Sequence, residues 1–179
     1  TASVTGMYAM FEDRNQGSQS SSFNQDISSW NTAAVTSMES MFREATVFNQ
    51  NINTSGSSWN TSAVTNMSNM FHDASSFNQD VSSWNTAAVT NMQGMFRGAT
   101  VFNQNINTSG SSWNTAAVTN MSNMFHDASS FNQDISSWNT ALVNDMNNMF
   151  RDASAFNQDI NTNGNSWNTA TVSNMKDMF

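Results

Sequence analysis

The feature of this sequence that most constrains its fold is a repeat that alternates between two lengths. Six tryptophans each precede Asn-Thr, and the gaps between them are alternately long and short. They are Trp30, Trp59, Trp84, Trp113, Trp138 and Trp167. The phenylalanines that begin each "FNQ" alternate in the same way, and they are Phe23, Phe48, Phe77, Phe102, Phe131 and Phe156. The chain therefore repeats one short unit, and alternate copies carry four more residues. Such a chain is expected to form a stack in which each unit contacts only its neighbours.

Large apolar residues recur at fixed places within every unit. All 14 methionines lie in the pattern "V-x-x-M-x-x-M-F", and all 13 phenylalanines either follow the second methionine of that pattern or begin "FNQ". A pattern this strict predicts that each unit buries the same set of side chains. If the segment that starts at Val64 is helical, its apolar residues share one face. The pattern therefore predicts one short helix per unit, which needs packing because it is too short to be stable alone.

The segment that follows each helix pattern predicts a short strand. In "FNQDVSSW" the valine and the tryptophan frame an extended stretch, and strands of successive units are expected to lie about 4.8 Å apart in a parallel sheet. The asparagines of "FNQ" and "WNT" are expected to bond the backbone of the next unit. We therefore predict an α/β repeat solenoid in which each coil has a short strand and a short helix. It would form a single domain over residues 1–179, as a segment of a longer array.

The extra residues of alternate units come between the isoleucine and the tryptophan. They turn "DISSW" into "NINTSGSSW" and occupy residues 53–56, 107–110 and 161–164. We predict that they form staggered polar loops along one edge of the stack, with their glycines as the turn residues. Their threonines are candidate binding residues of this loop edge. These are Thr54, Thr108 and Thr162.

The unit "VTNMSNMFHDASSFNQDISSWNT" resembles the repeat of mycoplasma-type surface lipoproteins, which is similar to the BspA-like class of leucine-rich repeats. The resemblance covers nearly the whole chain and rests on "MF-x-x-A-x-x-FNQ" with a following "WNT". It implies leucine-rich-repeat-like coils and a role in adhesion or protein–protein interaction at a cell surface or outside the cell. It supplies no catalytic residues to carry over.

The charge of the chain excludes two classes of partner. Five Lys and Arg stand against 13 Asp and Glu, which gives a formal net charge of −8. So few cations cannot neutralise the phosphates of a nucleic acid or bind an anionic membrane surface. No apolar run approaches the roughly 20 residues that cross a bilayer, and the absence of cysteine excludes disulfide and thiolate chemistry. An acidic chain rich in Ser, Thr and Asn fits an extracellular or cell-surface location.

Candidate catalytic and metal-binding groups are sparse. His72 and His126 occupy equivalent places two units apart, which sheet spacing puts about 10 Å or more from each other, too far to share a metal ion. Acidic residues follow "FNQ" in four units, at Asp26, Asp80, Asp134 and Asp159, and asparagine replaces them at Asn51 and Asn105. Each is expected to bond a turn amide, because one carboxylate per coil cannot surround a calcium ion. We therefore expect no enzyme, no catalytic residue, no metal site and no cofactor.

A column of threonines is the strongest candidate for a binding surface. One threonine follows each "WN", and evenly spaced hydroxyls on a flat sheet could bind a repetitive surface such as ice or a polysaccharide. The alternative is that a threonine simply fits a strand end or a turn at this place. The column consists of Thr32, Thr61, Thr86, Thr115, Thr140 and Thr169.

Three hypotheses for function follow. The first is a non-enzymatic scaffold for adhesion or protein–protein interaction, with a protein or glycan partner. The second is a binder of ice or polysaccharide that uses the threonine column. The third is end-to-end self-association into a filament, because both ends of the chain carry the same apolar part of the unit. The apolar residues concerned are Met7, Met10 and Phe11 near one end and Met175, Met178 and Phe179 near the other.

Overall fold

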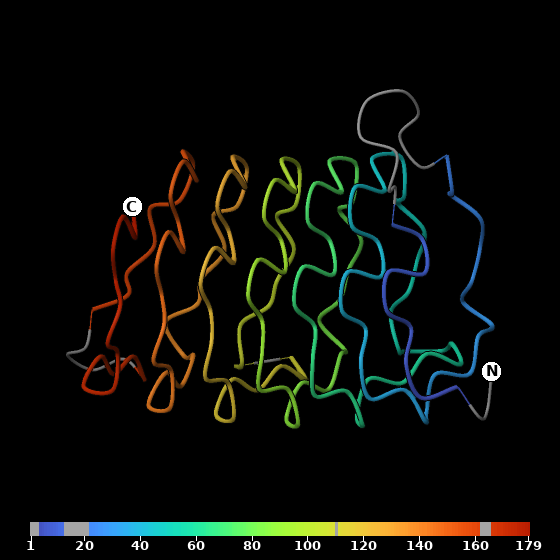
Figure 1. The fold of residues 1–179 in the computed structure, drawn as a ribbon, viewed down its shortest axis with the longest axis horizontal. Helices are drawn as coiled ribbons and strands as arrows, with labels where there is room; N and C mark the ends of the chain where they lie inside the picture. The colour runs from blue at the N-terminus through green and yellow to red at the C-terminus, as the bar shows by residue number, and fades with distance from the viewer. Residues whose placement is uncertain (1–3, 13–21, 110, 162–165) are drawn as a thin grey trace.

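The chain winds through a row of similar coils that lie side by side (Figure 1). A computed structural model describes residues 4–12, 22–109, 111–161 and 166–179. Each described coil pairs with the next through a parallel β-bridge of one residue, and the bridged residues are Gly6, Ser37, Asn66, Asn91, Asn120, Asp145 and Asn174. Beyond the longer first coil, the gaps between these residues are alternately long and short, which confirms the predicted alternation.

The secondary structure differs from the prediction. Within the described ranges the chain forms turns, bends and isolated bridges, and it contains neither a helix nor a strand longer than one bridged residue. The predicted α/β repeat solenoid with leucine-rich-repeat-like coils, each a short strand plus a short helix stacked into a parallel sheet, is therefore wrong. The repeating unit is instead one coil of the chain, which consists mainly of turns.

Left-handed backbone explains why the predicted helices do not form. In the coil that starts at Val64, the φ angles of Asn69 and Asp73 are 54° and 58°. Residues with positive φ cannot continue a right-handed helix, and Asn, Asp and Gly adopt this conformation most readily. The equivalent pairs in the neighbouring coils are Ser40 and Glu44, Gly94 and Gly98, Asn123 and Asp127, and Asn148 and Asp152.

The hydrogen bonds of this segment alternate between two kinds of partner. Met70, His72 and Ala74 each donate to the carbonyl three residues earlier, at 3.3, 3.1 and 3.1 Å, as in overlapping turns. Four odd-numbered residues of the same segment donate to the next coil instead, at 2.7–3.0 Å: Met67 to Asn91, Asn69 to Gln93, Phe71 to Met95 and Asp73 to Arg97. The neighbouring coil thus satisfies the amides that a helix would pair internally, so the segment needs no regular secondary structure.

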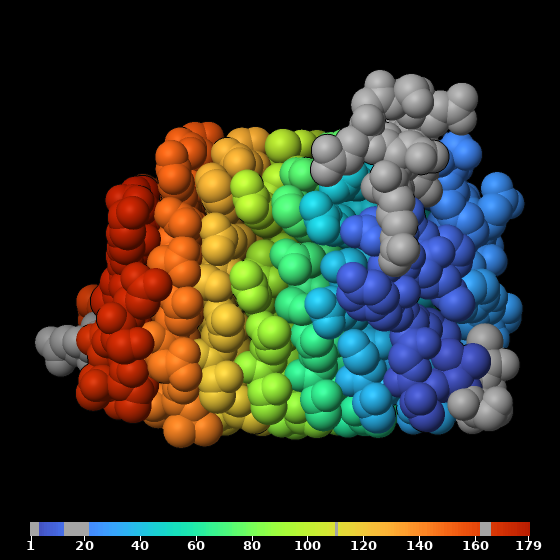
Figure 2. Space-filling view, in the orientation of Figure 1, coloured from blue at the N-terminus to red at the C-terminus, as the bar shows by residue number. Residues whose placement is uncertain are grey.

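The core follows the predicted pattern. In the coil that starts at Val64, the side chains of Val64, Met67, Met70, Phe71 and Ala74 are completely buried. Apolar side chains thus fill the interior of each coil, while the coils form contiguous bands on the visible face of the molecule (Figure 2).

Aromatic rings continue this packing from coil to coil. Phe71 stacks on Phe77 of its own coil with ring centroids 3.9 Å apart, and on Phe42 and Phe96 of the adjacent coils at 5.5 and 5.6 Å. The indole N–H of buried Trp84 donates to the Ile52 carbonyl of the preceding coil at 2.9 Å. The same contacts recur along the chain, so these buried rings and hydrogen bonds fix the position of each coil relative to the next.

Two kinds of asparagine side chain accept hydrogen bonds in the coils, and their partners differ. The Oδ1 atom of Asn78 in "FNQ" accepts the backbone amide of Asn103 in the next coil at 3.0 Å, as predicted. The same oxygen accepts the Gln104 side-chain amide at 3.0 Å. The asparagine of "WNT" behaves differently, because Asn85 Oδ1 accepts the Ala87 amide of its own turn at 3.0 Å. Of these two side chains, only that of the "FNQ" asparagine bonds a neighbouring coil.

Candidate binding surface

The threonine column that was one candidate binding surface lies almost entirely inside the stack. Five of its side chains, Thr32, Thr61, Thr86, Thr115 and Thr140, are exposed by 1% or less, whereas Thr169 is exposed. The Thr86 hydroxyl donates to the Asn114 carbonyl at 2.8 Å, and the Asn114 amide returns a bond to that hydroxyl at 2.8 Å. The five buried hydroxyls hold coils together, and a partner on the surface cannot reach them.

A different set of threonines reaches the surface. Each follows the buried valine of its unit, and Thr36, Thr65, Thr90 and Thr119 are all exposed; we call these four residues the threonine row. Asn144 and Ser173 continue the row and are exposed as well. The sequence pattern missed this row, because a threonine at the start of a predicted helix fits the role of a helix cap.

Hydrogen bonds between coils hold the threonine row in register. The Thr65 amide donates to the Thr36 carbonyl at 2.8 Å, and the Thr90 and Thr119 amides each donate to the preceding threonine at 2.9 Å. Each hydroxyl also donates to that same preceding carbonyl, at 3.2, 3.3 and 3.2 Å for Thr65, Thr90 and Thr119. The hydroxyl oxygens keep their capacity to accept, so the row presents acceptors at the spacing of about 4.8 Å that is typical of paired backbones.

The side chains around the threonine row are short and mostly uncharged. Ala87 and Ala116 each lie in an exposed turn on one side of it, and the bridged residues Asn66, Asn91 and Asn120 lie on the other. Side chains of this size cannot reach far from the backbone. The row therefore lies in a surface whose shape follows the regular stacking of the coils.

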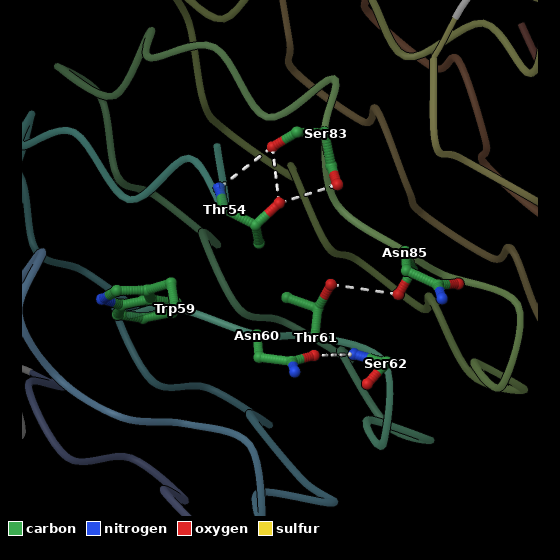
Figure 3. Close-up of a pocket in the computed structure, with 7 residues that line it drawn as sticks. All are labelled: Thr54, Trp59, Asn60, Thr61, Ser62, Ser83 and Asn85. Atoms are coloured by element: carbon green, nitrogen blue, oxygen red, sulfur yellow. Dashed lines mark hydrogen bonds between the residues drawn. The ribbon is translucent and has the colours of Figure 1, made fainter. Parts of the chain in front are cut away.

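Hydrogen bonds to the next coil hold the loop edge in place. The Thr54 amide and hydroxyl bond Ser83 Oγ in the next coil at 3.0 and 2.7 Å, and Thr108 repeats the contact with Ser137 at 3.1 and 2.6 Å. Gly56, with a φ of 77°, is the predicted turn residue. Thr162 lies outside the described residues. Beside Thr54 is a hollow of about 310 Å³, and Figure 3 shows the residues that line it. It is lined by Thr54, Trp59, Asn60, Thr61, Ser62, Ser83 and Asn85.

The acidic residues after "FNQ" bond turn amides, as predicted. Asp134 Oδ1 accepts the Ser136 amide at 2.8 Å, and its Oδ2 accepts the Asn107 side chain at 2.9 Å. The Ser136 amide is the main reason that the pKa of Asp134 is lowered, and the bond from Asn107 lowers it further. Asp26 has a lowered pKa for the same reason, because Ser28 donates to it. These carboxylates stabilise turns on separate coils.

Charged side chains gather where each coil turns after "MF". His126 Nε2 lies 3.4 Å from Asp127 Oδ2 and 3.9 Å from Asp152 Oδ2 on the next coil. The earlier histidine repeats the first of these contacts, since His72 Nε2 lies 3.3 Å from Asp73 Oδ2. Burial lowers the pKa of His72; Asp73 opposes this shift, and Arg97, Arg43 and His126 add to it. The sequence pattern indicated that the two histidines lie too far apart to share a metal ion, and it did not reveal that two carboxylates lie beside His126.

The two ends of the stack are partly apolar. A hollow of about 340 Å³ lies near the C-terminal end among Phe150, Phe156 and Phe179. Phe179 is 72% exposed and Met175 43%, whereas Met7 and Met178 are buried. The predicted end-to-end association is not tested by these exposures and stays a prediction. Among the described residues we find no helix with the length and apolar character that a membrane crossing requires.

Comparison with known proteins gives one match. Neither a curated protein nor a solved structure matches the chain. The relation to BspA-like leucine-rich repeats therefore stays a prediction. The sequence model of one family matches residues 1–56, 52–110 and 107–179, which together span the chain. The chain belongs to this family, which is described as "Mycoplasma protein of unknown function, DUF285".

Proposed function

We propose that this chain is a non-enzymatic recognition scaffold that acts at a cell surface or outside the cell, and that its threonine row binds an extended, regular partner. The observation that carries this proposal is the register of the row: exposed threonines occupy one equivalent place in four successive coils. Hydrogen bonds between coils set these positions before a partner arrives. Little conformational entropy is then lost on binding, which favours affinity.

The lining of the hollow beside Thr54 supports a non-enzymatic role. Acid–base catalysis needs a titratable group within hydrogen-bond reach of the substrate. The residues that line this hollow are threonine, serine, asparagine and tryptophan, and none of them titrates near neutral pH. The hollow can therefore hold water or a polar group, but its lining offers no proton donor or acceptor for chemistry.

Ice is the regular partner that the threonine row fits best. Its surface is a lattice of water oxygens, and the row offers hydroxyls and methyl groups at one repeated spacing. Polysaccharides commonly bind proteins through exposed aromatic rings. The clearly exposed rings of the described residues are Tyr8 and Phe179, which belong to opposite ends of the stack and not to the row. This distribution favours ice over a polysaccharide.

Thermal hysteresis and ice-crystal shape test this proposal. We expect the wild-type chain to facet growing ice crystals and to separate the freezing point from the melting point. Replacing both Thr65 and Thr90 by Arg should abolish both effects, because two long charged side chains break the regular row. The matched control places Arg at Ser76 and Val101, which are exposed on the same two coils but outside the row. If the wild type has no effect on ice, or if the two double variants behave alike, the ice proposal is refuted.

Adhesion to a protein partner is the second candidate, and the loop edge favours it. The same anchored loop recurs at Thr54 and Thr108, two coils apart, so the edge could contact a partner at two places. Binding of the labelled chain to a panel of immobilised extracellular proteins and glycans tests this candidate. Deletion of residues 53–56 should weaken such binding, whereas arginine at Thr65 and Thr90 should not. The opposite result would assign recognition to the threonine row.

A further inference from the structure

We propose that His126, Asp127 and Asp152 bind a divalent transition-metal ion of the zinc class at the junction of two coils. The three potential ligand atoms all lie within 4.8 Å of one another. His126 Nε2 is 3.4 Å from Asp127 Oδ2 and 3.9 Å from Asp152 Oδ2. A tetrahedral ion with bonds of 2.0–2.1 Å keeps its ligands roughly 3.3–3.4 Å apart. One of these two separations already fits, and the other closes with a small movement of an exposed aspartate.

The donor set selects the class of ion. One imidazole nitrogen with two carboxylates suits zinc and its neighbours in the transition series. Calcium and magnesium prefer sites made only of oxygen, and calcium takes six to eight ligands. Three protein ligands leave a fourth position for water, so the proposed ion would stay accessible from solvent.

The stack holds the ligands in place before an ion binds. Asp127 and Asp152 occupy equivalent left-handed positions, with φ angles of 61° and 59°. The Asp127 amide donates to the Arg151 carbonyl at 2.9 Å, which fixes the two coils against each other at this point. His126 Nδ1 is buried without a hydrogen-bond partner. Nε2 faces the two carboxylates and is the nitrogen that an ion would bind.

A neighbouring cation limits the affinity. Arg151 Nε lies 3.5 Å from Asp152 Oδ2, so the guanidinium competes with an incoming ion for this carboxylate. The exposure of the two aspartates, 53% and 65% of the side chain, admits water to the site and weakens electrostatic attraction. Both effects predict moderate affinity, and removal of the Arg151 charge should tighten binding.

The equivalent place two coils before His126 provides an internal control for the proposed metal site. His72 and Asp73 reproduce the first ligand pair at 3.3 Å, but Gly98 occupies the place that corresponds to Asp152. The earlier coil therefore lacks the third ligand, and we expect one ion per chain rather than two. A β-carbon at Gly98 would meet Asp73 Oδ1. Any side chain at residue 98 would displace the Asp73 carboxylate, so the earlier coil serves as a control with only two of the three ligands.

Isothermal titration of the whole chain with zinc chloride tests the proposal. We expect one ion per chain, and Asp152→Asn should weaken binding by about tenfold or more because a charged ligand is lost. Asn is tolerated here, since Asn69, Asn123 and Asn148 adopt positive φ in this structure. Asp73→Asn is the matched control and should leave the affinity unchanged. Arg151→Gln should tighten binding.

Two results would overturn the proposal. One is a wild-type chain that releases no binding heat with zinc at millimolar concentration. The other is an equal effect of Asp152→Asn and Asp73→Asn, since scattered surface carboxylates would then account for the binding. Melting temperatures of all variants without zinc show whether each is folded. A variant that does not fold is replaced by His126→Gln, with His72→Gln as its control.

Discussion

Replacing Trp84 by Ala should be among the most damaging single changes to an inner coil. The side chain is completely buried, and its ring lies 6.1 Å from Phe71 and 6.4 Å from Trp59 of the preceding coil. Loss of a buried tryptophan costs about 3–5 kcal/mol through lost contacts and the cavity that remains. The substitution also leaves the Ile52 carbonyl without the indole N–H that it accepts at 2.9 Å, which adds about 1–3 kcal/mol. The total is a large share of the roughly 5–15 kcal/mol by which folded proteins are stable.

Thermal unfolding followed by circular dichroism or calorimetry measures this effect. Each kcal/mol lowers the melting temperature by about 2–4 °C in a chain of this size, so we expect Trp84→Ala to lower it by about 10 °C or more. Trp84→Phe keeps a ring but loses the N–H donor, and it should have a smaller effect. Trp30→Ala is the control, because Trp30 lies in the first coil and is only partly buried. A melting temperature for Trp84→Ala within about 2 °C of the wild type, or equal to that of Trp30→Ala, would refute the stacked-core account.

Two further predictions concern a loop and a histidine. Deletion of residues 53–56 should leave a folded chain that unfolds cooperatively, because the shorter coils lack this loop. The loss of the Thr54–Ser83 hydrogen bonds should lower the free energy of unfolding by about 1–3 kcal/mol, as measured by denaturant titration. Loss of cooperative unfolding would contradict this prediction. For His72, the folded state has a lowered pKa, so the unfolded chain binds more protons as the pH falls below about 6.5, and stability is lost there. The wild type should therefore lose more melting temperature than His72→Gln between pH 7.5 and pH 5.5, and equal losses in the two proteins would contradict the assignment.

The sequence alone predicted the period and the core correctly, because both depend on spacing that every coil repeats. It failed on local conformation, since apolar residues such as Met67 and Met70 are three residues apart in a helix face and in overlapping turns alike. Asn69 and Asp73 carry a signal for left-handed backbone, as do Gly94 and Gly98. Ser40 and Glu44 adopt the same conformation in the preceding coil, although their residue types do not suggest it.

The candidate sites were harder to predict than the core. A column of identical residues has the same period whether it faces the interior or the solvent. Periodicity therefore could not show that Thr86 is buried while Thr90 is exposed. The cluster of His126, Asp127 and Asp152 joins two coils. It becomes visible only when successive units are aligned and residues one unit apart are treated as neighbours.

The most direct test of the central claim is the partition of the fluorescently labelled chain between liquid water and a slowly growing ice crystal. If the threonine row binds ice, the wild type and the Ser76→Arg, Val101→Arg control should enter the ice, and the Thr65→Arg, Thr90→Arg variant should stay in the liquid. A wild-type chain that remains in the liquid, or a row variant that enters the ice as well as the wild type does, would contradict the account.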